Sequence, residues 1–202
     1  MSEADRAKWS RIYGAPDPER TDPGPGVPEP FVEAAVRALG PGDGRRALDL
    51  AGGLGRHALL LAERGFSTVL ADIAPEGLER AEAAARARGL EIGTVALDLD
   101  RAWAPLDASA PFEVVVVAWF RLTEPMWAEL CSRLSPGGRL ILVHPTRTNL
   151  ERHPRPSARW LAEPGAVAAE AARAGLVLVR AEEGWDQRGH HTARILAVEP
   201  ER

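Results

Sequence analysis

The sequence predicts an α/β fold in which a doubly wound sheet carries helices on both faces. From Arg46 onward, short apolar segments alternate with segments of helical periodicity, and this alternation is typical of a parallel sheet wound right-handed. The segment 112–118 (FEVVVVA) is almost continuously apolar, as expected for a strand buried on both faces. The loop between the last two apolar segments, 176–180 and 192–198, is too short for a crossover helix, so these strands should pair antiparallel.

Glycines, prolines and capping residues set the predicted boundaries of the elements. Gly65 and Gly89 end two helices, Pro75 suits a first helical turn, and Thr123 caps a further helix. The predicted strands are 47–51, 67–71, 92–97, 112–118, 139–143, 176–180 and 192–198. The predicted helices are 1–13, 31–39, 56–64, 75–88, 123–134 and 164–174.

The chain of 202 residues has an ordinary length for one α/β domain, which we expect to occupy residues 31–199. Residues 1–30 are expected to form an N-terminal helix and a lid segment rich in proline and glycine. Six prolines and three glycines between residues 14 and 30 exclude a regular helix or a central strand there. Trp9 and Tyr13 share one face of the helix, and they either close over a ligand or fasten the helix to the body.

The composition of the chain limits the binding partners and the cellular compartment that we expect. With 29 acidic and 25 basic residues the net charge is −4, which disfavours general nucleic-acid binding. The sequence shows neither a bilayer-spanning apolar run nor a signal-peptide pattern, so we expect a cytoplasmic protein without membrane association. The single cysteine, Cys131, excludes an internal disulfide and a multi-cysteine zinc site. No metal site is expected, because the adjacent His190 and His191 would point to opposite faces of a strand.

A glycine-rich turn at residues 49–58 (DLAGGLGRHA) follows the first strand of the alternating region and opens a helix. Glycines in this setting let the backbone approach a ligand closely. The pattern G-x-G-x-x-A from Gly53, with Asp72 following 19 residues later, fits a dinucleotide-binding turn. Asp49 favours a different ligand, because its carboxylate would repel a pyrophosphate and attract an ammonium group.

Acidic residues also follow the next strands in the chain. Asp72 follows the second strand, and Asp98 and Asp100 follow the third, where a carboxylate can accept a hydrogen bond from an adenine amino group. One acid at a strand end is commonly a solvated residue. Acids at the carboxyl ends of three consecutive parallel strands instead indicate a ligand site, because ligands of such sheets bind at that edge.

Four motifs resemble those of class I S-adenosylmethionine-dependent methyltransferases: Asp49-x-Ala51-x-Gly53-x-Gly55, Asp72, Asp98-Leu99 and 135–140 (SPGGRL). The resemblance is strong over residues 46–144. With the flanking segments it is greatest to the compact bacterial branch that includes tellurite-resistance-type and small-molecule enzymes. It implies a seven-stranded Rossmann-like sheet of order 3-2-1-4-5-7-6 with the last strand antiparallel. It also implies in-line methyl transfer from S-adenosyl-L-methionine, leaving S-adenosyl-L-homocysteine.

The same resemblance implies roles for residues at the strand ends. Asp49 would meet the cofactor's ammonium, Asp72 the ribose hydroxyls and Asp98 the adenine amino group, with the ring held between aliphatic side chains. The implied cofactor-binding set is Asp49, Ala51, Gly53, Gly55, Asp72, Ile73, Asp98, Leu99 and Ala118. Family members often have glycine and cysteine where this chain has Ala51 and Gly52, and alanine is small enough for the turn.

Topology indicates which side chains face the methyl acceptor. The expected substrate pocket is formed by Trp9, Tyr13, Trp119, Arg121, Arg147 and His191. Residues 144–159 contain four arginines and two histidines against one acid, which favours an anionic small molecule; the alternative is a solvated loop in an arginine-rich protein. His144 is the candidate general base because imidazole titrates near neutrality, and the alternative is a structural histidine at a strand end.

The sequence therefore predicts an S-adenosylmethionine-dependent methyltransferase acting on a small molecule. Only the N-terminal segment and the loop 144–159 remain outside the core to shape a pocket. Displacement at an activated sulfonium requires alignment and exclusion of water rather than a catalytic triad. Two alternatives stay open: a nicotinamide-dependent Rossmann oxidoreductase, and a non-catalytic module that binds S-adenosylmethionine.

Overall fold

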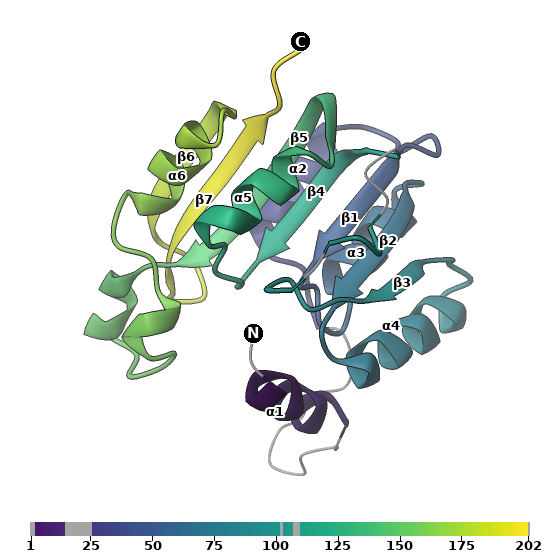
Figure 1. Ribbon diagram of the computed structural model, residues 1–202, viewed down its shortest axis with the longest axis horizontal. Coiled ribbons are helices and arrows are strands. Elements are labelled where there is room, and N and C mark those ends of the chain that lie inside the picture. The colour runs from purple at the N-terminus through teal and green to yellow at the C-terminus, as the bar shows by residue number, and fades with distance from the viewer. Residues whose placement is uncertain (1–2, 15–25, 102, 107–109, 202) are drawn as a thin grey trace.

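The computed structural model describes residues 3–14, 26–101, 103–106 and 110–201. These residues form a seven-stranded sheet with the order β3-β2-β1-β4-β5-β7-β6 (Figure 1). Strand β7 runs antiparallel to both of its neighbours, β5 and β6, whereas the other pairs are parallel. The predicted fold class, strand order and antiparallel last strand are confirmed.

The bounds of the elements agree with the sequence prediction to within two residues except at α5, β5 and β6; α5 ends at Cys131 rather than at 134, because β5 begins at Leu134. The strands are β1 (Arg46–Leu50), β2 (Ser67–Asp72), β3 (Gly93–Ala96), β4 (Phe112–Ala118), β5 (Leu134–Pro145), β6 (Val177–Trp185) and β7 (His191–Val198). The helices are α1 (Glu3–Gly14), α2 (Pro30–Ala38), α3 (Arg56–Glu63), α4 (Pro75–Ala87), α5 (Glu124–Cys131) and α6 (Ala166–Arg173), with 3-10 turns η1 (Arg147–Glu151) and η2 (Ala158–Trp160). Residues 135–138, which precede the predicted strand 139–143, lie inside β5 at a register shift against β4. Strand β6 is longer than predicted because its pairing with β7 continues to Trp185.

Strand β4 is buried on both faces of the sheet. Val114 and Val116 belong to a cluster with residues of α2 and α3, whereas Val115 and Val117 belong to a cluster with residues of α5 and α6. In Figure 1, α5 lies in front of the sheet and α2 behind it. Each buried valine contributes roughly 1.5–3 kcal/mol of transfer free energy. The continuous apolar pattern of this strand thus follows from its two covered faces.

Helix α1 lies apart from the sheet, beyond the carboxyl ends of the central strands (Figure 1). It packs against α4, where Nη1 of Arg80 donates a hydrogen bond of 3.0 Å to the Tyr13 carbonyl. The rings of Trp9 and Tyr13 stack with centroids 5.5 Å apart. Residues 15–25, which make up most of the predicted lid segment, lie outside the described residues.

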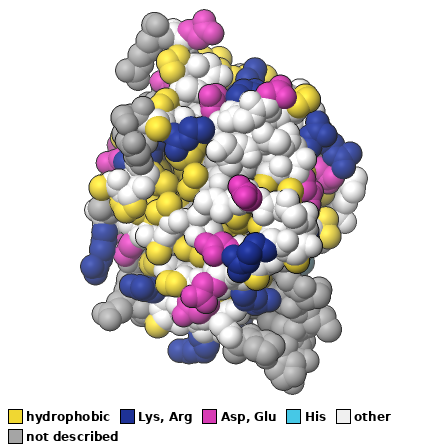
Figure 2. All heavy atoms as spheres, turned by 90° about the vertical axis from the view of Figure 1, so that its right-hand side faces the viewer, with side chains coloured by type: hydrophobic (Ala, Val, Ile, Leu, Met, Phe, Trp, Pro, Cys, Tyr) yellow, Lys and Arg dark blue, Asp and Glu magenta, His cyan; other side chains and the backbone are white. Residues whose placement is uncertain are grey.

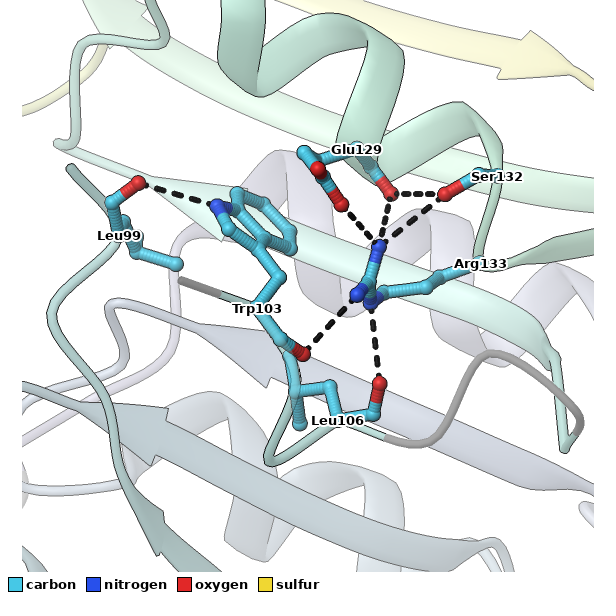
Figure 3. A network of polar contacts seen from close by, with 6 residues as sticks. All are labelled: Leu99, Trp103, Leu106, Glu129, Ser132 and Arg133. Atoms are coloured by element: carbon cyan, nitrogen blue, oxygen red, sulfur yellow. Dashed lines mark hydrogen bonds and ion pairs between the residues drawn. The ribbon is translucent and has the colours of Figure 1, made fainter. Parts of the chain in front are cut away.

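A buried arginine fixes the loop that follows β3. Arg133 donates hydrogen bonds to the carbonyls of Trp103 (2.9 Å) and Leu106 (3.1 Å), and it pairs with the Glu129 carboxylate (Figure 3). The indole nitrogen of Trp103 in turn donates to the carbonyl of Leu99 at 3.0 Å. Arg133 therefore holds the loop against α5 by binding the backbone carbonyls of the loop.

Candidate functional site

A cavity of about 260 Å³ lies at the carboxyl ends of β1, β2 and β4, with α1 across it. Its described lining consists of Trp9, Tyr13, Ala51, Gly52, Gly53, Leu54, Arg56, His57, Asp72, Ile73, Ala118, Trp119 and Phe120. Doubly wound sheets bind their ligands at this edge. The cavity brings together eight residues of the sequence-predicted site: Trp9, Tyr13, Ala51, Gly53, Asp72, Ile73, Ala118 and Trp119.

The glycine-rich turn leaves no space for side chains at two positions. A Cβ atom on Gly52 would lie 2.4 Å from Oδ2 of Asp49, and a Cβ atom on Gly53 would lie 2.6 Å from the Tyr13 hydroxyl. Gly53 also has a φ of 57°, in the left-handed region that favours glycine. The backbone at this turn therefore forms the cavity wall directly, and α1 packs against it.

Asp72 is held at the end of β2 by backbone donors. Its Oδ2 accepts a hydrogen bond of 2.9 Å from the Gly53 N–H, and its Oδ1 accepts one of 3.0 Å from the Ala74 N–H. Burial is the largest influence on this group and raises the pKa of the Asp72 carboxyl above its usual value, against the two backbone hydrogen bonds. Each carboxylate oxygen keeps a further lone pair that a ligand hydroxyl can use.

Asp49 is fully buried at the end of β1, behind the cavity wall. Its Oδ2 accepts a hydrogen bond of 2.9 Å from the Ala58 N–H in the first turn of α3. Its Oδ1 has no hydrogen-bond partner among the described residues and lies 3.8 Å from Nδ1 of His57. A buried carboxylate oxygen without a donor is costly, so this atom is suited to meeting a cationic ligand group.

Two residues that line the cavity have strained backbones. Ala51 has a φ of 55° and Trp119 a φ of 61°, whereas only Asp43 shares this property among the other described non-glycine residues. The left-handed region costs L-residues roughly 1–2 kcal/mol. Backbone strain of this kind concentrates at functional sites, where the surrounding structure maintains it.

Glu29 is a site residue that the sequence analysis missed. Its side chain is 4% exposed, and its Oε1 accepts a hydrogen bond of 2.8 Å from the indole nitrogen of Trp119. The same oxygen lies 3.2 Å from guanidinium nitrogens of both Arg56 and Arg188. Its backbone N–H donates to Nε2 of His57 at 3.2 Å. One residue thus joins the segment before α2 to α3, β4 and the β6–β7 hairpin.

The β6–β7 hairpin contacts the cavity lining through His190, which packs against Trp119. Its ring meets the ring of Trp119 edge-on, with centroids 5.0 Å apart, and lies 5.1 Å from the ring of His153. Nδ1 of His190 is buried without a described hydrogen-bond partner. We refer to Trp119 together with Arg188 and His190 of the hairpin as the hairpin wall.

Besides Asp49, three predicted cofactor-binding residues do not line the cavity. Gly55 caps α3 with a φ of 78°, and a Cβ atom there would lie 2.8 Å from Cβ of Ala81. Asp98 pairs with Arg101 at 3.5 Å. Leu99 is buried in the core beside α5, in the loop fixed by Arg133 (Figure 3).

Two predicted pocket arginines lie outside the cavity and are paired with glutamates. Arg121 lies 2.5 Å from the Glu170 carboxylate, and both side chains are largely buried. Burial alone would raise the pKa of the Glu170 carboxyl, but the hydrogen bond from Arg121 and the charge of that guanidinium together hold it below its usual value. Arg147 pairs with Glu163 on the exposed surface. The structure therefore gives both arginines a partner within the protein.

The two predicted histidines also lie away from the cavity. Nδ1 of His191 lies 2.7 Å from the Thr146 hydroxyl. His144 is 2% exposed, and its Nε2 lies 3.0 Å from the Trp160 carbonyl, to which it donates. Burial, together with the charge of Arg121, lowers the pKa of His144 to about 4. At neutral pH this imidazole is therefore uncharged and a weak base.

The described residues contain no group of three or more His, Cys, Asp or Glu side chains placed to hold a metal ion. Within the same residues, no helix has the length and apolar character that a membrane crossing requires.

The strand order, the antiparallel β7 and a cavity between the glycine-rich turn and Asp72 define a class I methyltransferase fold. Residues 47–138 match the family described as Methyltransferase domain. A demethylmenaquinone methyltransferase of Thermus thermophilus is 41% identical over 105 residues, which cover 49% of this chain and 46% of that protein. A tRNA 5-carboxymethoxyuridine methyltransferase of Escherichia coli is 29% identical over 102 residues, covering 48% and 39%.

The chain thus spans about half the length of the curated relatives it matches, or less. Solved structures match over more of the chain. The N-methyltransferase NodS from Bradyrhizobium japonicum, in complex with S-adenosyl-L-homocysteine, has a TM-score of 0.69 at 18% identity, covering 97% of this chain and 98% of that one. A TehB-like methyltransferase from Corynebacterium glutamicum has a TM-score of 0.63 at 19% identity, covering 100% of both. At such identities these likenesses establish the fold.

Proposed function

We propose that this protein transfers a methyl group from S-adenosyl-L-methionine to an anionic small molecule. The observation that carries the proposal is the Asp72 carboxylate, held 2.9 Å from the Gly53 amide inside a cavity that the aromatic face of α1 covers. When bound, S-adenosyl-L-methionine supplies a methyl group already activated by its sulfonium. The protein then has to orient the two reactants and exclude water.

The residues of the cavity fit the parts of this cofactor. Asp72 has lone pairs left for the ribose hydroxyls, and the apolar side chain of Ile73 lies beside it for contact with the adenine. The unpartnered Oδ1 of Asp49 suits the ammonium group. We assign the binding of adenine to Asp98 and Leu99, which lie in the loop that Arg133 fixes. Helix α1 acts as a lid over a catalytic domain formed by residues 31–199.

The protonation state of the site favours an acceptor without a proton to lose. His57 is the one histidine among the described residues that line the cavity, and its Nε2 already accepts a hydrogen bond from Glu29. His144 is a weak base at neutral pH because burial lowers its pKa to about 4. An acceptor that enters as an anion needs no general base. Arg56 and Arg188 share one glutamate, so this side of the site has a positive excess for such an anion.

The geometry disfavours the nicotinamide alternative. A dinucleotide pyrophosphate binds to free amide groups at a helix N-terminus. Here the Ala58 N–H in the first turn of α3 is already bonded to Asp49, whose negative charge would repel a pyrophosphate.

Charge favours a small acceptor over a nucleic acid, although the Escherichia coli relative is named for a tRNA substrate. The net charge is −4. On the face that Figure 2 shows, basic and acidic side chains are interspersed without a continuous basic surface. Nucleic-acid binding relies on clustered Lys and Arg side chains, which that face lacks.

Calorimetry followed by label transfer tests the proposal. S-adenosyl-L-homocysteine should bind with a measurable heat, whereas NADH should not. Label from methyl-tritiated S-adenosyl-L-methionine should then enter small carboxylate or oxyanion acceptors rather than neutral amines, alcohols or total tRNA. Heat with NADH alone would identify an oxidoreductase. Binding without transfer to any acceptor class would identify a non-catalytic module.

A further inference from the structure

The tautomer of His57 follows from its contact with Glu29. His57 lies in the first turn of α3 and is 2% exposed. Its Nε2 accepts a hydrogen bond of 3.2 Å from the backbone N–H of Glu29. An imidazole nitrogen that accepts a hydrogen bond carries no proton, so the proton of the neutral ring is on Nδ1. His57 therefore presents an N–H donor on its other side.

That donor faces the unpartnered oxygen of Asp49. Nδ1 of His57 lies 3.8 Å from Oδ1 of Asp49, which has no described hydrogen-bond partner. The Ala58 N–H already holds the other oxygen, Oδ2, at 2.9 Å. The Ala58 hydrogen bond restrains the carboxylate, and the N–H of His57, which at 3.8 Å is too far from Oδ1 for a hydrogen bond, adds an electrostatic attraction to that oxygen.

We propose that His57 is a positioning residue that orients the Asp49 carboxylate toward the ammonium group of the bound nucleoside. The inference rests on the proposed function, because it assigns Asp49 to that ammonium. A neutral donor suits this task better than a lysine or an arginine. It attracts the oxygen across 3.8 Å without neutralising the negative charge that attracts the ligand.

The arrangement also connects the two sides of the cavity. The backbone of Glu29 fixes the tautomer of His57, and the side chain of Glu29 accepts a hydrogen bond from the indole of Trp119. The segment before α2 thereby links the hairpin wall to the carboxylate at the end of β1. A change in His57 should consequently affect the amino-acid end of the nucleoside and leave its sugar and base unaffected.

Two nucleosides separate a positioning role from a structural one. S-adenosyl-L-homocysteine carries the ammonium group, and 5′-methylthioadenosine has the same base and sugar without the amino-acid part. By calorimetry, His57→Phe should raise the Kd of S-adenosyl-L-homocysteine about tenfold and leave that of 5′-methylthioadenosine within twofold. His57→Asn places an amide N–H near the position of Nδ1, and it should restore binding to within about threefold of the original.

A matched control measures general destabilisation. Leu61→Ala removes a fully buried side chain from the same helix, outside the cavity lining, and should leave the ratio of the two Kd values unchanged. In an Asp49→Asn background, the additional effect of His57→Phe should disappear. Equal weakening of both nucleosides by His57→Phe, or no weakening, would overturn the inference. A wild-type protein that binds neither nucleoside would instead overturn the proposed function.

Discussion

The indole nitrogen of Trp119 donates a hydrogen bond of 2.8 Å to the carboxylate of Glu29, ninety residues earlier in the chain. The contact joins the end of β4 to the segment before α2 at the wall of the cavity. Trp119 has a left-handed backbone, which is unfavourable for a bulky residue. This partly buried hydrogen bond stabilises the conformation and sets the orientation of the ring beside the cavity.

Loss of the Glu29 charge should destabilise the protein. In Glu29→Gln the amide oxygen can still accept from Trp119, but Arg56 and Arg188 lose their shared carboxylate. We expect the free energy of unfolding to fall by about 1–3 kcal/mol in urea denaturation. The matched control is Glu33→Gln, which breaks a surface pair with Arg37 and should cost less than about 0.5 kcal/mol. Equal losses in the two variants would contradict a special role for Glu29.

Replacement of alanine by glycine should have opposite effects on stability at two positions, Ala51 and Ala83. Ala51 has a φ of 55°, so Ala51→Gly relieves left-handed strain and should stabilise the protein by about 0.5–1 kcal/mol after the entropy of glycine is included. Ala83 is exposed in α4, and Ala83→Gly should destabilise the protein by about 1 kcal/mol. Thermal unfolding of both variants shows whether each substitution raises or lowers stability. A loss of stability in Ala51→Gly would show that the backbone at Ala51 carries no strain.

Arg133 should be important for stability because its guanidinium is buried among carbonyls (Figure 3). Arg133→Met leaves the carbonyls of Trp103 and Leu106 without their donor, and the free energy of unfolding should fall by about 2–4 kcal/mol. Arg86→Met removes an arginine of the exposed pair with Glu82 and should change stability by less than about 0.5 kcal/mol. Chemical denaturation that ranks the two variants equally would be inconsistent with the buried network.

His144 should make the protein less stable in mild acid. Burial lowers its pKa from 6.5 to about 4, so the unfolded chain binds a proton at a higher pH than the folded protein does. The stabilisation from His144 is therefore fully present above pH 6.5 and is lost progressively as the pH falls toward 4. The shift corresponds to roughly 3 kcal/mol.

His144→Gln tests this pH dependence, because the amide can donate to the Trp160 carbonyl as Nε2 does but does not titrate. The free energy of unfolding of the wild type should fall more steeply than that of the variant between pH 6.5 and 4. Parallel curves over this range would mean that another group dominates the acid response.

The aromatic face of α1 should increase nucleoside affinity. A chain that begins at Gly26 lacks Trp9 and Tyr13, which line the cavity, and keeps Glu29 and α2. We expect the Kd of S-adenosyl-L-homocysteine to rise roughly tenfold, which corresponds to about 1.4 kcal/mol of lost apolar contact. Circular dichroism checks that the shortened chain is folded. An unchanged Kd would show that α1 is fastened to α4 without covering the ligand.

The fold was predictable because its signals are local. Alternation of strand and helix patterns, the doubly buried β4 and the short final connection are each visible within a few residues. The same holds for Gly53 and Asp72, whose spacing reflects a turn and the strand that follows it. These two residues meet in the structure because parallel strands bring their carboxyl ends to one edge.

Glu29 was not predictable, because its contacts join residues far apart in the sequence. It meets Trp119 across 90 residues and Arg188 across 159, and it lies between two prolines in a segment interpreted as a lid. The histidine pair shows a second limit. Strand β7 begins at His191, and its side chain contacts Thr146, whereas His190 in the connecting turn reaches Trp119. A shift of one residue in register changes the face that a side chain occupies, and sequence patterns leave such a shift open.

The contact between Arg188 and Glu29 also constrains the order in which the protein matures on the ribosome. A nascent chain can pair β1, β2, β3 and β4 well before the final hairpin has been translated. The carboxylate of Glu29 receives Arg188 only after nearly the entire polypeptide has emerged. The hairpin side of the cavity is thus completed only at the end of biosynthesis.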